Sequence, residues 1–139
     1  MSDVFKHLHR VSYSECTLGN HVYYARYLDI LEEARGEFFR HAGEPLQKWQ
    51  AQDFMFPVTE AQLKYKGAAR YDDLIEIRVT PVQITRIRLQ FRYEIYRENM
   101  LLLEATISHV CTGLDEKPKR MPVELCETLN GFLSPSAAP

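Results

Sequence analysis

Cysteine is scarce in this 139-residue chain, and the few thiols stand far apart. Cys16, Cys111 and Cys126 form no CxxC pair and no disulfide-like spacing, which is typical of a reducing compartment. A run of about 18 uncharged apolar residues is also missing, so the sequence predicts no membrane span. The first residues lack the apolar stretch of a signal peptide. Together these absences predict a cytoplasmic protein.

An excess of charge of either sign is missing as well. The 17 Lys and Arg residues face 19 Asp and Glu residues, a net charge of −2, which gives no basic field to hold a nucleic acid. The length suits one ordinary domain, which we expect at residues 1–133. The remaining residues, 134–139, read SPSAAP, and we expect them to be a disordered tail.

The most regular apolar pattern lies between residues 24 and 42. Its apolar positions recur at steps of three and four, namely Tyr24, Tyr27, Leu28, Leu31, Ala34, Phe38, Phe39 and Ala42. Most charged residues of this stretch fall on other faces, and Gly43 and Pro45 then give a stop signal. The pattern predicts one long amphipathic helix of about 20 residues.

After this helix the apolar period changes to two, which is typical of half-buried antiparallel strands. The expected strands, including a first strand before the helix, lie within residues 4–13, 56–66, 75–80, 88–95 and 101–108. Arg97-Glu98-Asn99 indicates a hairpin turn, and Pro122 is expected to open a short C-terminal helix. The prediction is an α+β domain in which a curved antiparallel sheet of about five strands wraps one long helix.

A short segment before the helix concentrates polar and reactive side chains. It reads V-S-Y-S-E-C-T-L-G-N-H-V-Y-Y-A-R-Y-L-D-I-L-E-E-A-R, residues 11–35. With the order of strand, long helix and four strands, this segment resembles the hotdog-fold acyl-CoA thioesterases, specifically the 4-hydroxybenzoyl-CoA thioesterase branch. Weaker matches are Tyr71-Asp72-Asp73-Leu74, Phe91-x-Tyr93-x-Ile95 and Lys119-Arg120-x-Pro122.

The resemblance covers nearly the whole chain and implies a hotdog fold that hydrolyses an acyl-CoA or aroyl-CoA thioester without a metal or cofactor. It also implies a homodimer or homotetramer with each pocket between two subunits, and a substrate carbonyl near residues 20–24. The family's reactive carboxylate is the second acid of an acid-x-Asp pair. Here Glu15 matches the first acid, while Thr17 stands where the Asp is expected.

Two side chains are candidates for activating water. If the two-residue strand period persists to this point, the Glu15 side chain lies on the same side as Thr17 and acts as a general base. In the alternative, Glu15 accepts hydrogen bonds from loop amides or pairs with Arg35 or His21. His21 matches the family's Gly-His-Val form, and imidazole suits proton transfer at neutral pH; alternatively it satisfies a backbone carbonyl. The hydroxyl of Thr17 stays protonated, so it orients a water or fills space.

The start of the helix supplies the other half of the chemistry. Free N–H groups and the positive end of the helix dipole stabilise a developing oxyanion. Asn20 lies at this site or simply caps the helix. Val22, Tyr23 and Tyr24 are the further substrate-binding candidates, although the spacing of Tyr24 and Tyr27 also suits the core.

The remaining signals are weaker. Arg86 and Arg88 are among the surface cations that the resemblance assigns to the phosphates of coenzyme A, and no Gly-rich phosphate loop is present. A Cys16 nucleophile is disfavoured because alternation turns its side chain away from the two candidate residues. His7 and His9 share a strand face, but the sequence shows no third ligand, so we predict no metal.

The leading prediction is therefore a small acyl-CoA or aroyl-CoA thioesterase. Because Thr17 replaces the Asp, the alternative is a non-hydrolytic or weakly active acyl-thioester-binding protein of the same fold. A hydratase or dehydratase is the third possibility, which is less favoured because such enzymes pair a His with an acid in another motif context.

Overall fold

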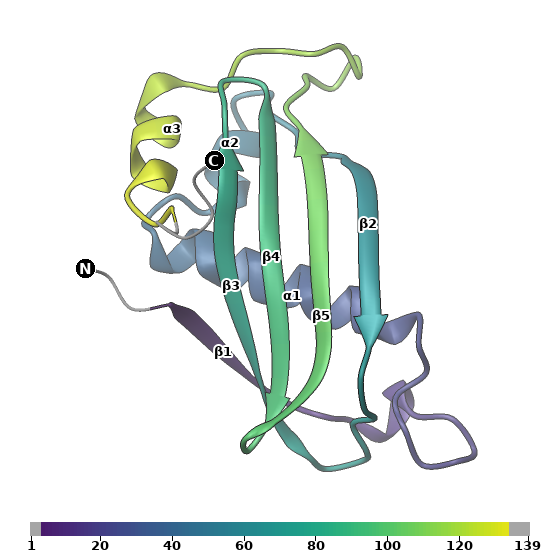
Figure 1. Ribbon diagram of the computed structural model, residues 1–139. Helices are drawn as coiled ribbons and strands as arrows, with labels where there is room; N and C mark the ends of the chain where they lie inside the picture. Colours follow the sequence, from purple (N-terminus) through teal and green to yellow (C-terminus); the bar gives the residue numbers. More distant parts are fainter. Residues whose placement is uncertain (1–3, 134–139) are drawn as a thin grey trace.

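A computed structural model describes residues 4–133 (Figure 1). Five strands form one antiparallel sheet in the order β1-β3-β4-β5-β2. They are β1 (Phe5–Arg10), β2 (Val58–Tyr65), β3 (Leu74–Ile84), β4 (Arg88–Arg97) and β5 (Met100–Val110). The helical elements are the 3-10 turn η1 (Tyr13–Glu15) and the helices α1 (Arg26–His41), α2 (Leu46–Gln50) and α3 (Val123–Asn130). The predicted α+β architecture is confirmed.

The long helix α1 lies across one face of the sheet (Figure 1). Its buried side consists of Tyr27, Ile30, Leu31, Ala34, Phe38 and Phe39. The facing side chains of β3 and β4 alternate as predicted, and the buried ones are Ile75, Ile77, Val79, Leu89, Phe91, Tyr93 and Ile95. Each large apolar side chain that is fully buried stabilises the fold by roughly 1.5–3 kcal/mol. This contact is what holds the helix to the sheet.

Departures from the sequence prediction include the lengths of α1 and β1 and the presence of α2. The long helix has 16 residues rather than about 20, because a turn in which the Arg26 N–H donates to the Tyr23 carbonyl precedes it. The first strand ends at Arg10, since a 3-10 turn follows at Tyr13–Glu15. Helix α2 was not predicted, because five residues are too few to display a helical period.

The predicted turns and ends are largely confirmed. Gly43, with φ of +80°, follows α1 as a stop, and Pro122 immediately precedes α3. The β4–β5 hairpin turns at Glu98, with φ of 55°. The predicted disordered tail, 134–139, lies outside the described residues. Across residues 4–133, no helix is long and apolar enough to cross a membrane.

Candidate active site

The segment between η1 and α1 folds as a small hairpin. Cys16 and Val22 form an antiparallel bridge, and the Thr17 N–H donates to the His21 carbonyl at 2.9 Å. Asn20 closes the turn in the left-handed conformation, with φ of 55°, and its N–H donates to the Thr17 carbonyl at 3.0 Å. The strand period therefore does not persist to residue 17, so the condition that would turn Glu15 to the same side as Thr17 is not met. The hairpin carries the candidate residues Thr17, Asn20, His21 and Val22 and precedes the start of α1 in the chain.

Helix α1 begins without a side-chain cap. Its N-cap residue is Ala25, which has no capping group. Asn20 does not cap the helix, because its side-chain oxygen accepts the Tyr71 N–H at 3.3 Å; that expectation was wrong. Among the residues that the structure describes, the N–H groups of Tyr24 and Ala25 have no hydrogen-bond acceptor. Two unpaired amides at the positive end of a helix form a binding position for a carbonyl oxygen or oxyanion.

The carboxylate of Glu15 is turned toward β1 and is 16% exposed. Its Oε1 accepts the Ser12 N–H at 2.8 Å, and His9 Nε2 lies 2.9 Å from Oε1 and 3.0 Å from Oε2. The expected contact with a loop amide is confirmed, but the ionic partner is His9, so the expected pairing with Arg35 or His21 is wrong. Donors engage both oxygens of Glu15, so water reaches this carboxylate only if one of these contacts is given up.

His21 is exposed on the hairpin. Its Nδ1 lies 3.4 Å from the Val22 carbonyl oxygen, and because a carbonyl only accepts, this long contact suits the tautomer with the proton on Nδ1. That tautomer leaves the lone pair of Nε2 free to take a proton. A Cβ at Gly19 would lie 3.0 Å from Nε2, so glycine makes room for the ring. Thr17 Oγ1 accepts the Gly19 N–H at 3.3 Å and is part of the turn.

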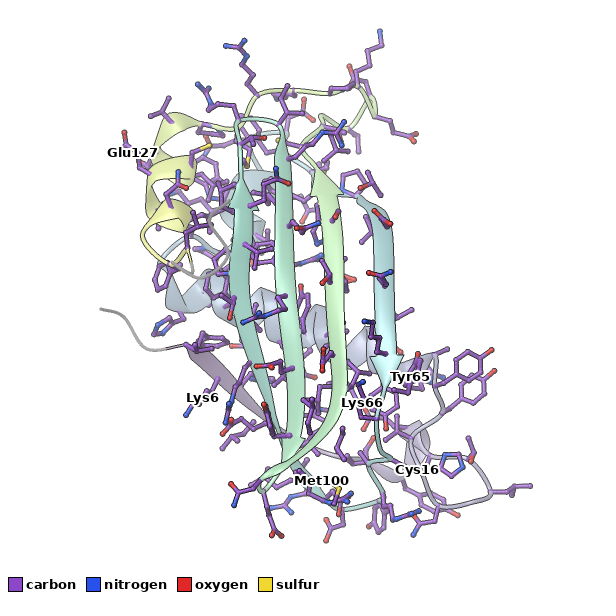
Figure 2. All side chains as sticks on the ribbon, in the orientation of Figure 1. Lys6, Cys16, Tyr65, Lys66, Met100 and Glu127 are labelled. Atoms are coloured by element: carbon purple, nitrogen blue, oxygen red, sulfur yellow. The ribbon has the colours of Figure 1, made fainter. Side chains whose placement is uncertain are left out.

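Three exposed tyrosines surround the start of α1. The ring centroids of Tyr23 and Tyr24 are 4.7 Å apart, and those of Tyr24 and Tyr65 are 6.5 Å apart. The Tyr65 hydroxyl donates to the Tyr24 carbonyl at 3.1 Å, and Figure 2 shows Tyr65 near the end of β2. Tyr24 is 61% exposed, so its expected place in the core is wrong, whereas Tyr27 is buried. The exposed rings form an apolar surface at the start of α1.

Three other predicted substrate-binding residues have different surroundings. Val22 is buried, and its N–H donates to the Ala69 carbonyl at 2.9 Å, so it anchors the hairpin. Arg86 and Arg88 lie at the β3–β4 turn, at the opposite end of the sheet from the hairpin (Figure 1). Arg86 Nε donates to the Met121 carbonyl at 2.7 Å. A single chain therefore does not bring these two arginines to the start of α1.

One polar cluster joins β1 to α1 and was missed by sequence spacing. His7 Nε2 and His9 Nδ1 lie 2.6 and 2.9 Å from the same oxygen of Glu33. The sequence offered no third partner for the two histidines, because Glu33 follows His9 by 24 residues and comes near only through packing. The H-x-H pattern was the available signal.

A second missed histidine is buried under the middle of α1. The Nδ1–H of His109 donates to the Phe56 carbonyl at 3.0 Å, and Arg35 Nη1 lies 3.2 Å from Nε2. Burial, together with the Arg35 charge, lowers the pKa of His109 to about 4. The ring is therefore neutral at pH 7 and serves the fold rather than proton transfer.

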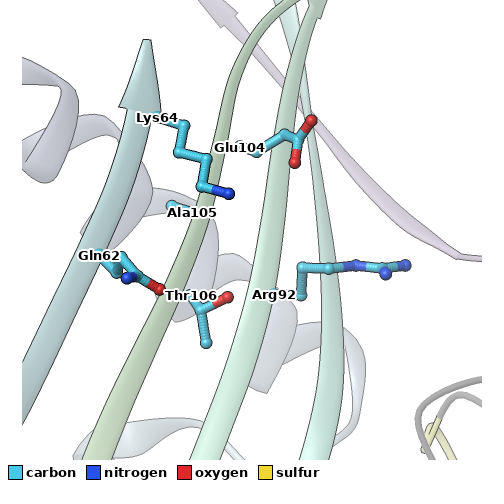
Figure 3. A pocket seen from close by; sticks show the side chains of 6 residues that line it. All are labelled: Gln62, Lys64, Arg92, Glu104, Ala105 and Thr106. Atoms are coloured by element: carbon cyan, nitrogen blue, oxygen red, sulfur yellow. The ribbon is translucent and has the colours of Figure 1, made fainter.

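The outer face of the sheet, away from α1, has a shallow hollow (Figure 3). Its lining residues are Gln62, Lys64, Arg92, Glu104, Ala105 and Thr106. This lining combines charged and amide side chains but includes neither an imidazole nor an uncapped helix start. The α1 start is therefore the stronger candidate for thioester chemistry.

The fold and the uncapped helix start define a hotdog-fold protein, as predicted. A family model described as the thioesterase-like superfamily matches residues 3–129. The chain belongs to this superfamily.

Individual relatives agree with this assignment. The acyl-CoA thioester hydrolase YbgC of Escherichia coli is 35% identical over 115 residues, which cover 81% of this chain and 86% of the relative. The acyl-CoA thioesterase YbgC of Haemophilus influenzae is 30% identical over 118 residues, covering 84% and 87%. The crystal structure of a hypothetical protein from Thermus thermophilus superimposes with a TM-score of 0.87 at 30% identity, covering 91% and 98%.

Proposed function

We propose that this protein hydrolyses acyl-CoA or aroyl-CoA thioesters to the free acid and coenzyme A. The observation that carries the proposal is the start of α1, where the Tyr24 and Ala25 amides are unpaired among the described residues and follow directly on the hairpin that bears His21. The names of the E. coli and H. influenzae relatives support this reaction class.

In the proposed reaction the thioester oxygen accepts hydrogen bonds from the Tyr24 and Ala25 amides. His21 Nε2 takes a proton from water while the water oxygen bonds to the carbonyl carbon. The amides and the helix dipole stabilise the tetrahedral oxyanion that forms. Its collapse breaks the C–S bond, and the departing thiolate receives the proton from His21.

Glu15 has a positioning role in this scheme. Its carboxylate joins η1 to β1 through Ser12 and His9, and its carbonyl accepts the Tyr23 N–H at 2.9 Å. The residue thereby fixes the backbone immediately before the two reactive amides. A base role for Glu15 is the competing assignment, and it requires this carboxylate to leave its present donors.

The acyl or aroyl group is proposed to pack on the exposed rings of Tyr23, Tyr24 and Tyr65. Arg86 and Arg88 remain proposed contacts for the phosphates of coenzyme A. Since they lie at the other end of the sheet, they reach a substrate at the helix start only from a neighbouring subunit.

We therefore also propose a homodimer or homotetramer, with the cytoplasm as its compartment because the cysteines are free thiols. Strand β2 is an edge of the sheet, and an uncovered edge strand is a template for pairing with another chain. Its Val58 and Tyr65 are 50% and 47% exposed. A mass in solution of two or four times 16.3 kDa is expected; a monomer at working concentrations would contradict the shared pocket.

Free-thiol release from a panel of acyl-CoA and aroyl-CoA thioesters tests the function. His21→Gln and Glu15→Gln separate the two candidate bases, and His41→Gln, an exposed histidine at the far end of α1, is the matched control. Loss of turnover in His21→Gln with substantial turnover in Glu15→Gln assigns the base to His21. Absence of thiol release from every substrate overturns the proposal, and hydration of an enoyl-CoA without thiol release points to a hydratase.

Thr17 favours a second candidate function, binding of an acyl thioester without efficient hydrolysis. Its hydroxyl is engaged in the turn with Gly19 and supplies no carboxylate at the position where the family carries its Asp. Saturable binding of acyl-CoA without thiol release would establish this second function.

A further inference from the structure

The cluster of His7, His9 and Glu33 is built from two regular elements. Strand β1 alternates, so His7 and His9 are partly buried on the side facing α1, while Lys6 is exposed on the other side, where Figure 2 shows it pointing outward. Glu33 lies on α1, and its oxygen contacts a nitrogen of each imidazole. The three ligand atoms lie within 4.8 Å of one another.

Contacts between imidazole nitrogens and carboxylate oxygens join the members of this cluster. Carboxylates only accept hydrogen bonds, so the contacts of His9 Nδ1 with Glu33 and of His9 Nε2 with Glu15 require both nitrogens to be protonated. The geometry thus already favours a positive charge between β1 and α1.

We propose that His7 Nε2, His9 Nδ1 and Glu33 form a binding site for a borderline divalent transition-metal ion, with Zn²⁺ as the representative. Two imidazoles and one carboxylate are a donor set suited to this class of ion. The metal takes the place of the protons on His7 Nε2 and His9 Nδ1. Glu33 is 44% exposed, which leaves a side open for a water ligand.

Glu15 fixes the orientation and tautomer of the His9 ring in this site. By accepting from His9 Nε2 at 2.9 Å, Glu15 keeps the proton on that nitrogen and turns the lone pair of Nδ1 toward Glu33. A carboxylate behind a metal-binding histidine fixes its tautomer in this way. In a tetrahedral zinc site with bonds of about 2.0–2.1 Å, ligand atoms lie roughly 3.3 Å apart. The two imidazole nitrogens lie 2.6 and 2.9 Å from the Glu33 oxygen. A small change in side-chain rotamers is therefore enough to reach the spacing that a bound zinc ion requires.

Calorimetric titration of the metal-stripped full chain with zinc chloride at pH 7.5 tests the proposal. We expect one saturable site per chain, with affinity reduced at least 100-fold in His7→Gln and Glu33→Gln. Glu15→Gln should weaken binding roughly 10- to 100-fold, because it removes the group that orients His9. His41→Gln, which removes an imidazole outside the cluster, should bind as tightly as the unchanged chain.

Cysteine is the competing ligand, since Cys16 is partly exposed. With Co²⁺ in place of Zn²⁺, we expect the visible bands of a tetrahedral nitrogen and oxygen site without a thiolate charge-transfer band, and Cys16→Ser should not change them. Unchanged affinity in both His7→Gln and Glu33→Gln, a thiolate band, or no saturable binding would each overturn the proposal. The Co²⁺ spectrum of the unchanged chain decides the matter if the variants do not fold. None of these readouts uses a thioester, so they are independent of the proposed hydrolysis.

Discussion

The polar groups at the start and in the middle of α1 have opposite surroundings: those at the start are open to a ligand, and those in the middle are buried. At the start, Tyr24 and Ala25 present amides that have no acceptor within residues 4–133, and the exposed His21 lies on the hairpin that precedes them in the chain. In the middle, Arg35 contacts the buried ring of His109, which is neutral because its pKa is lowered. The middle is closed by packing against the sheet, whereas the start leaves hydrogen-bonding capacity for a ligand. Substitutions at the two places should therefore separate activity from stability.

The largest expected effect is on catalysis at the open end. His21→Gln should lower kcat by about 10²–10⁴, the usual contribution of a positioned general base, while the thermal midpoint stays within a degree or two of the unchanged chain because the ring is exposed. Steady-state thiol release and calorimetry measure the two quantities. If His21→Gln kept the kcat of the unchanged chain, His21 would not be the proton acceptor. The proposed difference in function between the start and the middle of α1 would then be contradicted.

The converse variant lies in the part of α1 that is buried against the sheet. Phe38 is fully buried and its ring meets Phe5, Phe91 and Phe132. Phe38→Ala should lower the free energy of unfolding by about 3–5 kcal/mol through lost burial and a cavity. Urea unfolding measures this loss, and kcat per folded molecule should stay near that of the unchanged chain. A selective loss of kcat in the folded fraction would show that the two regions are coupled.

A pH titration of stability addresses His109 directly. Its pKa is lowered from 6.5 to about 4 on folding, so the unfolded chain binds the proton first as the pH falls. The neutral ring's contribution is complete above pH 6.5 and is lost as the pH falls through about 4, roughly 3 kcal/mol in all. Urea unfolding between pH 7 and pH 4 should show this loss in the unchanged chain and a shallower dependence in His109→Gln. Equal slopes would contradict the assignment.

The smallest effect concerns the hairpin. Thr17→Asp should raise kcat on the order of tenfold by returning a carboxylate to the position that the family uses. Leu18→Asp is the matched control, because it adds the same charge at the neighbouring, fully exposed position of the turn. An equal rise in both variants would point to a general effect of charge rather than to a specific base.

The core could be predicted from the sequence, because the side of each element that is buried requires apolar residues at a regular spacing. Apolar residues recur every three or four positions in α1 and every second position in β3 and β4. These spacings identify the side chains that pack between the helix and the sheet. Packing of these sides then leaves few alternative arrangements for the sheet.

The site was less predictable, because turns decide where its side chains point. Ser12-x-x-Glu15 is a capping-box pattern, and Gly19-Asn20 is a turn signal; both were present and would have argued against a continuing strand. The meeting of His7 and His9 with Glu33 depends on how β1 lies against α1, which no local pattern encodes.

The central claim is that the amides at the start of α1 bind a thioester carbonyl. A crystal structure with a non-hydrolysable acyl-CoA analogue, in which a methylene group replaces the thioester sulfur to give a ketone, tests it most directly. We predict the ketone oxygen within hydrogen-bond distance of the Tyr24 and Ala25 nitrogens, with the acyl group against Tyr65. An analogue bound elsewhere, with these amides covered by packed side chains in every subunit, would contradict the account.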